Sequence, residues 1–227
     1  MLSRRELLLA SIAALMCPHS TIANTVFREK FLWPEFRAEM AKLAETAAIK
    51  SPNQINMDGI GQQILKDLDI TTSEFKQAVD ASYETGNRYW LWQRMIKEPQ
   101  LNGGILTIDN DHLVQLHNHP GATGIVRILS GEAEVWQFDE ITHHNGVVEL
   151  QRASHRILKA GDTAALTPDS GNIHALRSIS KECRMLDFFI PPYKRSQRSW
   201  YVPLEQNWFE MEKISCNKIS QQDYMDA

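Results

Sequence analysis

Apolar positions near the N-terminus follow the spacing of an amphipathic helix. In residues 33–50, Phe36, Met40, Leu43 and Ala47 recur every three or four positions. Such spacing places them on one face and predicts a helix that packs by that face against the rest of the protein.

A shorter helix is predicted over residues 60–68, followed by another that begins at Thr71. Glu74 lies three residues after Thr71, which is the pattern of a capping box. We interpret this part of the chain as packing for the segment that follows. The inner face of the later helix would carry Phe75, Val79 and Tyr83.

From about residue 88 the pattern changes to short runs of β-branched and aromatic residues separated by turn signals. Ser130-Gly131 and Asn145-Gly146 are two of these signals. About eight strands with no helix between them predict an all-β sandwich or barrel rather than a parallel sheet. The predicted strands cover residues 89–96, 104–108, 124–129, 133–138, 147–150, 163–166, 174–179 and 184–190.

These patterns divide the chain into four parts. Residues 1–23 are predicted to be an export signal, 24–86 a helical region, 87–204 the β-barrel and 205–227 a polar C-terminal tail.

The predicted export signal consists of a charged start and an apolar core. Arg4 and Arg5 precede the apolar run 7–16, which is too short for a membrane span but has the length of a signal-peptide core. The paired arginines resemble a twin-arginine signal; a Sec signal or a packed N-terminal helix are the alternatives. We expect export to the periplasm, cleavage near Ala23, and no stable membrane insertion after processing.

Composition adds little to this picture. A chain of 227 residues, 43% hydrophobic and 23% charged, can form one well-packed domain with extensions, and we expect a monomer. A net charge of −4 gives no electrostatic reason to expect binding to nucleic acid. Cys17, Cys183 and Cys216 make no disulfide framework, although Cys183 and Cys216 could pair in an exported chain.

Two of the eight histidines have the spacing of metal ligands. His117 and His119 lie two residues apart on a segment expected to be extended, so both imidazoles would point to the same side and could bind one ion. Imidazole suits iron, zinc, copper and nickel, so the pair does not identify the metal, and such pairs also occur without one. The remaining histidines are predicted to lie in the signal (His19) or in turns and hairpin ends (His112, His143, His144 and His155).

Three short segments in the β region carry a family resemblance. They are residues 116–121 (LHNHPG), 170–174 (SGNIH) and 186–193 (LDFFIPPY). In this order they resemble the family of cysteamine dioxygenase and plant cysteine oxidase, within the cupin superfamily, and the resemblance extends from about residue 89 to 201. It implies a mostly β fold, a cupin (double-stranded β-helix or jelly-roll barrel) preceded by the helical region.

The resemblance also implies a set of metal ligands. His117 and His119 would come from the first cupin motif, and His174 from the second. Many cupins add a glutamate from the first motif, but Gly124 occupies that position here. Three uncharged ligands would leave the charge of the ion uncompensated, which favours an anionic substrate such as a thiolate.

The implied activity is that of a non-haem Fe(2+) thiol dioxygenase, which uses O2 to convert a small aminothiol or a Cys-initiated peptide to the sulfinic acid. Asp187 would orient the substrate amine or another group near the iron, and Tyr193 would line the substrate pocket. The alternatives are a strand-end role for Asp187 and a packing role for Tyr193.

Several residues depart from the family pattern. Animal members carry a cysteine at the position of Ser199, so the thioether crosslink to the tyrosine at position 201 cannot form here. Asn118 replaces an aspartate of the plant members, and Cys183, at a plant cysteine position, is interpreted as a core residue. No arginine can be placed opposite a substrate carboxylate, which makes free cysteine a less favoured substrate.

Two other functions fit the same three histidines. One is an oxygenase or isomerase that acts on a non-thiol ligand, and the other is a cupin that binds a metal or ligand without catalysis. The identity of the metal discriminates in part, because iron favours oxygenation.

Overall fold

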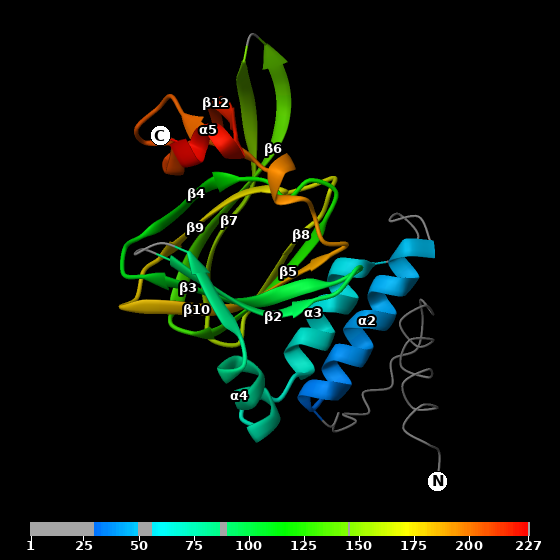
Figure 1. Cartoon of the computed structure of the whole chain (residues 1–227). Coiled ribbons are helices and arrows are strands. Elements are labelled where there is room, and N and C mark those ends of the chain that lie inside the picture. The colour runs from blue at the N-terminus through cyan, green and yellow to red at the C-terminus, as the bar shows by residue number, and fades with distance from the viewer. Residues whose placement is uncertain (1–29, 50–55, 87–89, 145, 227) are drawn as a thin grey trace, which may run out of the picture.

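The computed structural model describes residues 30–49, 56–86, 90–144 and 146–226, so the predicted export signal at residues 1–23 lies outside the described part. Two antiparallel sheets face each other, and three helices pack beside one of them (Figure 1). The mostly β barrel with a preceding helical region is confirmed. Within these ranges no helix is both long enough and apolar enough to cross a membrane.

The first sheet is open and has the strand order β1-β2-β3-β10-β5-β8. Its central strand, β10, pairs with β3 on one side and with β5 on the other. The strands are β1 (Tyr83–Gly86), β2 (Trp90–Lys97), β3 (Asn102–Asp109), β5 (Thr123–Ser130), β8 (Thr163–Leu166) and β10 (Glu182–Ile190).

The second sheet has the order β11-β12-β7-β6-β9-β4 and closes on itself, because β11 also pairs with β4. The closing contact places Trp200 opposite His117. The strands are β4 (Leu113–His117), β6 (Glu132–His144), β7 (Val147–Lys159), β9 (Ile173–Ser178), β11 (Ser199–Pro203) and β12 (Lys213–Ser220).

The helices α2 (Trp33–Ile49), α3 (Met57–Asp67) and α4 (Ser73–Asp80) cover the outer face of the first sheet (Figure 1). Side chains of β10 alternate between two faces, as expected for a strand. Leu186 and Phe188 belong to the hydrophobic cluster shared with the helices, whereas Cys183 and Met185 belong to a second cluster between the sheets. The helices therefore leave the inner face of β10 available to a site.

The predicted helices are present, but one boundary differs. Helix α4 is capped by Thr72, whose hydroxyl accepts a hydrogen bond from the Phe75 amide at 3.2 Å. Thr71 is not the cap, because its amide and hydroxyl both donate to the Asp69 carboxylate. Tyr83, expected on the inner face of this helix, instead begins strand β1.

The polar tail predicted for residues 205–227 contains regular structure. Strand β12 pairs with both β11 and β7, and α5 (Gln221–Asp226) follows it. Ile214 and Cys216 alternate with more exposed residues and are completely or almost completely buried. This segment therefore completes the closed sheet.

Cys183 and Cys216 are free thiols in separate hydrophobic clusters. Burial raises the pKa of each thiol to about 12. The disulfide that these two cysteines could form in an exported chain is absent from this structure. Cys183 has the buried core position expected for it.

Arg127 links the helices to the barrel. From β5, its Nη1 atom donates to the carbonyl oxygens of Leu65 at 2.8 Å and Leu68 at 2.9 Å, at the C-terminal end of α3. We predict that Arg127→Gln lowers the free energy of unfolding by about 1–3 kcal/mol, because a shorter side chain leaves these carbonyls unsatisfied.

Urea unfolding of the purified protein measures this change. Arg156→Gln is the matched control, since Arg156 is an exposed residue of β7 and its loss should change stability by less than about 0.5 kcal/mol. Equal stability of the two variants would contradict the prediction.

Candidate metal centre

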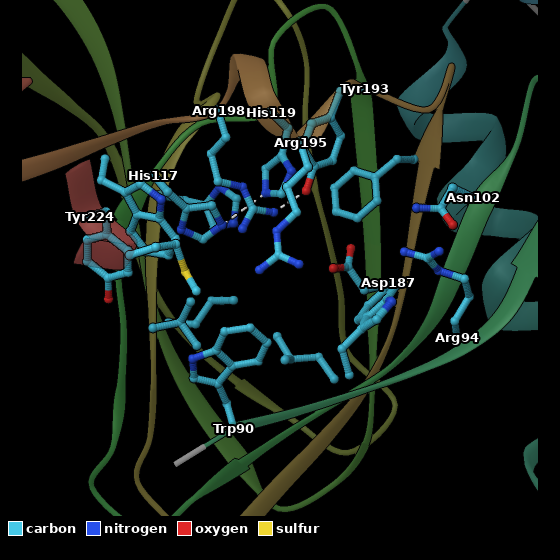
Figure 2. A pocket seen from close by; sticks show the side chains of 18 residues that line it. Trp90, Arg94, Asn102, His117, His119, Asp187, Tyr193, Arg195, Arg198 and Tyr224 are labelled. Atoms are coloured by element: carbon cyan, nitrogen blue, oxygen red, sulfur yellow. Dashed lines mark hydrogen bonds between the residues drawn. The ribbon is translucent and has the colours of Figure 1, made fainter. Parts of the chain in front are cut away.

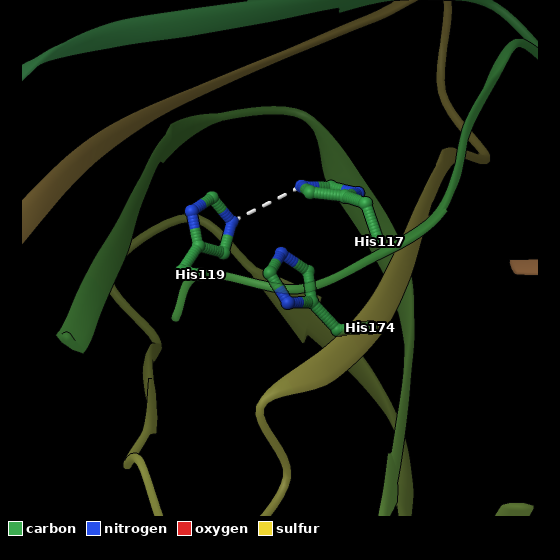
Figure 3. Close-up of side chains that lie close together, drawn as sticks. All are labelled: His117, His119 and His174. Atoms are coloured by element: carbon green, nitrogen blue, oxygen red, sulfur yellow. Dashed lines mark hydrogen bonds between the residues drawn. The ribbon is translucent and has the colours of Figure 1, made fainter. Parts of the chain in front are cut away.

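The pairing of two strands brings the three histidines together. In the register of β4 with β9, His117 lies directly opposite His174. His119 follows two residues after His117, just beyond the end of β4, so its side chain returns to the same side. The three rings point toward one another (Figure 3), and all three are buried.

Their ligand atoms converge on one point. The Nε2 atoms of His117 and His119 are 3.0 Å apart, and one ligand atom from each of the three rings lies within 4.8 Å of the others. Two metal–imidazole bonds of about 2.1 Å at right angles would place their nitrogens about 3 Å apart. The spacing of the first pair therefore fits two ligands of one ion.

The rings are buried and present neutral nitrogens. Their exposed fractions are 4%, 3% and 7% for His117, His119 and His174. Burial is the main cause that lowers their pKa values, that of His174 to about 4 and those of His117 and His119 well below the ordinary value. At neutral pH the lone pairs are therefore available to a metal.

Hydrogen bonds fix which nitrogen of two rings faces the centre. The Nδ1 atom of His117 lies 2.7 Å from the Gln115 carbonyl oxygen, and that of His174 lies 3.3 Å from the Asn172 carbonyl oxygen. Such bonds to Nδ1 leave Nε2 as the ligand atom. Unprotonated nitrogens that converge in a buried site bind a cation favourably, so these residues fit a metal ion.

Neighbouring side chains hold His119 in place. The Asn172 side chain accepts from the His119 amide at 2.8 Å and donates to the His119 carbonyl oxygen at 3.2 Å. The Phe189 ring stacks on His119 with centroids 4.4 Å apart. Asn172 lies in the SGNIH segment, but the sequence did not indicate this role.

A pocket of about 390 Å³ opens beside the histidines (Figure 2). It contains both non-ligand residues predicted from the sequence, Asp187 and Tyr193. Asp187 provides the only carboxylate among the described residues that line it, and this carboxylate is not among the groups close enough to share an ion with the histidines. The structure thus presents a three-histidine site.

Asp187 reaches the pocket from the inner face of β10, where it pairs with Gly104 and Val126. Burial raises the pKa of its carboxyl to about 7, and the positive charge of Arg198 opposes that rise. The carboxyl is therefore poised to exchange a proton near neutral pH.

Tyr193 stands edge-on to His119, with ring centroids 4.5 Å apart, and its hydroxyl accepts a hydrogen bond from Arg198. Burial raises the pKa of this hydroxyl, so it is neutral at physiological pH. Its placement is that of a pocket-lining residue.

Gly124 occupies a tight position on β5. A Cβ atom there would lie 3.0 Å from Leu166 and 3.2 Å from the Phe189 ring. A longer acidic side chain at this position would have to displace both neighbours. The packing is thus consistent with a ligand set that lacks a glutamate.

Sequence reasoning missed several residues of the pocket wall. Arg94, Arg195 and Arg198 all line it, as do Tyr224 and Met225 from α5. Arg195 and Arg198 were missed because their loop has no periodicity. Arg94 alternates with Trp90 and Trp92 on the predicted strand 89–96, and this spacing was an available signal for it. An available sequence signal that the tail is folded was an aromatic residue, Tyr224, in a polar segment. In the structure its ring centroid lies 3.7 Å from that of Trp200.

His19 lies outside the described residues, and the four other histidines set aside by sequence are not part of the centre, although one of them was misplaced. His155 lies within strand β7 rather than in a turn. Its ring stacks on Trp136, and its Nε2 atom lies 2.8 Å from a Glu134 carboxylate oxygen.

The raised pKa of Asp187 predicts a pH-dependent stability in the metal-free protein. The folded state holds a proton up to about pH 7, whereas the unfolded state releases it near 3.8. Between these values the free energy of unfolding falls as pH rises, by roughly 1.4 kcal/mol per pH unit. Asp187→Asn has no carboxyl that must ionise on unfolding, so its free energy of unfolding should not fall in this way. The variant should therefore gain stability relative to wild type at pH 8, and the gain at pH 4 should be small.

Urea unfolding of both metal-free proteins at the two pH values measures the difference. Titration of the histidines is common to both proteins and cancels. A stability difference that is the same at both pH values would show that Asp187 has an ordinary pKa.

Comparisons with known proteins agree with this site. The PCO_ADO family model matches residues 65–224, more than half of the chain. A probable 2-aminoethanethiol dioxygenase of Dictyostelium discoideum is 25% identical over 104 residues, which cover 44% of this chain and 48% of that protein. The chain thus matches about half the length of this curated relative.

Solved structures with a similar barrel include KdgF from Halomonas sp. (16% identity, TM-score 0.40), which matches 49% of this chain and 90% of its own. An RmlC-like cupin from Shewanella frigidimarina has 16% identity and a TM-score of 0.39, with coverage of 49% and 86%.

The family match includes all three histidines, Asp187 and Tyr193. The chain therefore belongs to the PCO_ADO family of cupin thiol dioxygenases.

Proposed function

We propose that this protein is a ferrous-iron dioxygenase that converts a small aminothiol or an N-terminal cysteine to the sulfinic acid with O2. The observation that carries the proposal is the convergence of three buried, neutral histidines on a pocket whose one described carboxylate is not a ligand. Family membership supports the same reaction class.

When bound, ferrous ion would activate O2 for oxidation of a thiol, whose sulfur supplies the electrons, and it would lower the pKa of that thiol. The three histidines hold the ion from one side without neutralising its charge. An anionic sulfur is therefore favoured on the side that faces the pocket. A ligand set with a carboxylate would compensate more of the charge and weaken this preference.

Asp187 is placed to act on the substrate amine. Its carboxyl lines the same pocket as the histidines, on the opposing sheet, and can accept a hydrogen bond from an ammonium group. Such a contact would orient an aminothiol between the two sheets. Phe189, two residues along the same face of β10, packs on His119 and lines the pocket with an apolar ring.

We also propose that the chain is exported to the periplasm. The paired residues Arg4 and Arg5 and the apolar run 7–16 support this proposal. Fractionation of cells that produce the full chain tests it: protein in the periplasmic fraction supports export, and protein retained inside argues against it.

Oxygen uptake tests the proposed activity. Signal-free protein loaded anaerobically with Fe(2+) should consume O2 with at least one thiol among cysteamine, cysteine and a short Cys-initiated peptide, and mass analysis should find the sulfinic acid. His174→Ala should bind iron more than about 100-fold more weakly than wild type, because one of three ligands is gone. The variant should therefore lose its turnover.

The barrel should remain folded in His174→Ala, since the packing of β9 does not depend on that imidazole, and circular dichroism checks this. Normal turnover in the variant would contradict the site assignment. If zinc or nickel alone supported a reaction of a non-thiol ligand, the alternative isomerase function would replace the proposal.

Asp187→Asn tests the role of the carboxylate separately from metal binding. The variant keeps the shape of the side chain but loses its charge, so turnover of an aminothiol should fall at least about 10-fold while iron content stays near wild type. Steady-state oxygen uptake and iron analysis on the same sample measure both. An unchanged rate would return Asp187 to a structural role.

A further inference from the structure

One side of the pocket carries several positively charged side chains, for which the proposed aminothiol substrates offer no anionic group besides the thiolate. Arg195 and Arg198 enter it from the segment between β10 and β11, near His119 and across from Asp187 (Figure 2). Arg94 lines the pocket from β2. Asp187 is the only acidic residue among the described lining residues.

Arg195 and Arg198 are held on the same side of their segment. Arg195 begins the one-turn 3-10 helix η2 (Arg195–Gln197), and Arg198 is its C-cap residue. Side chains three residues apart eclipse each other in a 3-10 helix. Both guanidinium groups can therefore act on one ligand group.

Arg198 is fixed in position by uncharged groups, and the buried Asp187 carboxyl, with a pKa of about 7, offsets its charge only in part. Its guanidinium lies 5.3 Å from the centroid of the Tyr193 ring and 5.6 Å from that of Trp200. Its Nη2 atom donates to the Tyr193 hydroxyl, which carries no charge at neutral pH, and its buried Nε atom has no hydrogen-bond partner among the described residues. A rigid guanidinium with unused donors is typical of a site for a carboxylate.

Arg195 is exposed and forms no ion pair within the described part of the chain. Its guanidinium projects into the pocket near that of Arg198 (Figure 2). Two guanidinium groups that enter one pocket favour an anion bound there, because each of them attracts it. A substrate with only an amine and a thiol could place its ammonium group at Asp187 but would offer neither guanidinium group an anionic partner.

We propose that the thiol oxidised by this protein is a small molecule that also carries a carboxylate, and that Arg198 and Arg195 bind this carboxylate. The inference rests on the proposed function and changes its substrate class from aminothiols and Cys-initiated peptides to small thiols with a carboxylate. It also revises the expectation that free cysteine is a less favoured substrate, because that expectation depended on sequence placing no arginine opposite a substrate carboxylate.

The size of the pocket favours a small thiol acid over a peptide. A volume of about 390 Å³ lies near the lower end for ligand pockets. Tyr224 and Met225 of α5 form part of the wall, and the Tyr224 ring is stacked on Trp200 beside Arg198. The carboxylate would thus be bound within a few bonds of the reacting sulfur.

Four thiols test the proposal on the iron-loaded protein. Cysteine has both an amine and a carboxylate, 3-mercaptopropionate has only the carboxylate, and cysteamine and cysteine methyl ester lack a free carboxylate. We expect kcat/KM for the two thiol acids to exceed that for the two others by at least about 10-fold, since a charge-assisted hydrogen bond contributes this much or more.

Arginine variants locate the effect. Arg198→Gln and Arg195→Gln should each lower the ratio of kcat/KM for 3-mercaptopropionate to that for cysteamine by about 10-fold or more, mainly through KM. Loss of a purely structural contact, such as the one from Arg198 to Tyr193, would affect both thiols equally and leave the ratio unchanged. Arg156→Gln, which removes the same charge from an exposed position on β7, should leave the ratio at its wild-type value.

Anaerobic binding gives a readout without turnover. Trp90, Trp92 and Trp200 line the pocket, so their fluorescence should report binding of 3-mercaptopropionate to the iron-loaded protein, with about 10-fold weaker affinity in Arg198→Gln.

The outcomes separate the two proposals. If kcat/KM for cysteamine and the methyl ester equals that for the thiol acids, the carboxylate site is wrong and the dioxygenase function stands. If only a Cys-initiated peptide is oxidised, the carboxylate site is likewise wrong and the dioxygenase function stands. If neither the four thiols nor the peptide are oxidised, the proposed function fails, and the fluorescence titration alone decides for or against the carboxylate site.

Discussion

The pairing of β4 with its two neighbours is the constraint on which the site depends. In one register His117 lies opposite His174 on β9 and opposite Trp200 on β11. A shift by one residue would turn the imidazole of His117 to the other face of the sheet and separate the histidines. The same pairing closes the second sheet, so closure of the barrel and assembly of the metal centre are one structural event.

The opposing sheet supplies what the histidines lack. Asp187 and Phe189 point inward from β10 because the alternate residues, Leu186 and Phe188, are buried against the N-terminal helices. The pocket has an excess of positive charge because arginines line it and the histidines carry no charge. Its single described carboxyl offsets this charge only in part, since burial raises the pKa of that carboxyl to about 7. Such a field favours anionic substrates.

The sequence predicted those features that local pattern determines. His117 and His119 could be paired because alternation along a strand places residues two apart on the same side, and the resemblance supplied His174, Asp187 and Tyr193. Arg195 and Arg198 could not be placed, because a short 3-10 turn between strands has no periodicity. Strand β12 was missed since its polar residues alternate with only two deeply buried ones, Ile214 and Cys216. The pairing that places β12, with β7, comes from a distant part of the chain.

The most direct test of the central claim is isotopic. The iron-loaded, signal-free protein is supplied with a thiol under oxygen-18 gas in ordinary water, and the product is analysed by mass. If three neutral histidines hold iron for a dioxygenase, the sulfinic acid should carry two oxygen-18 atoms. A product with one or no labelled atom, or a thiol recovered unchanged, would contradict the account.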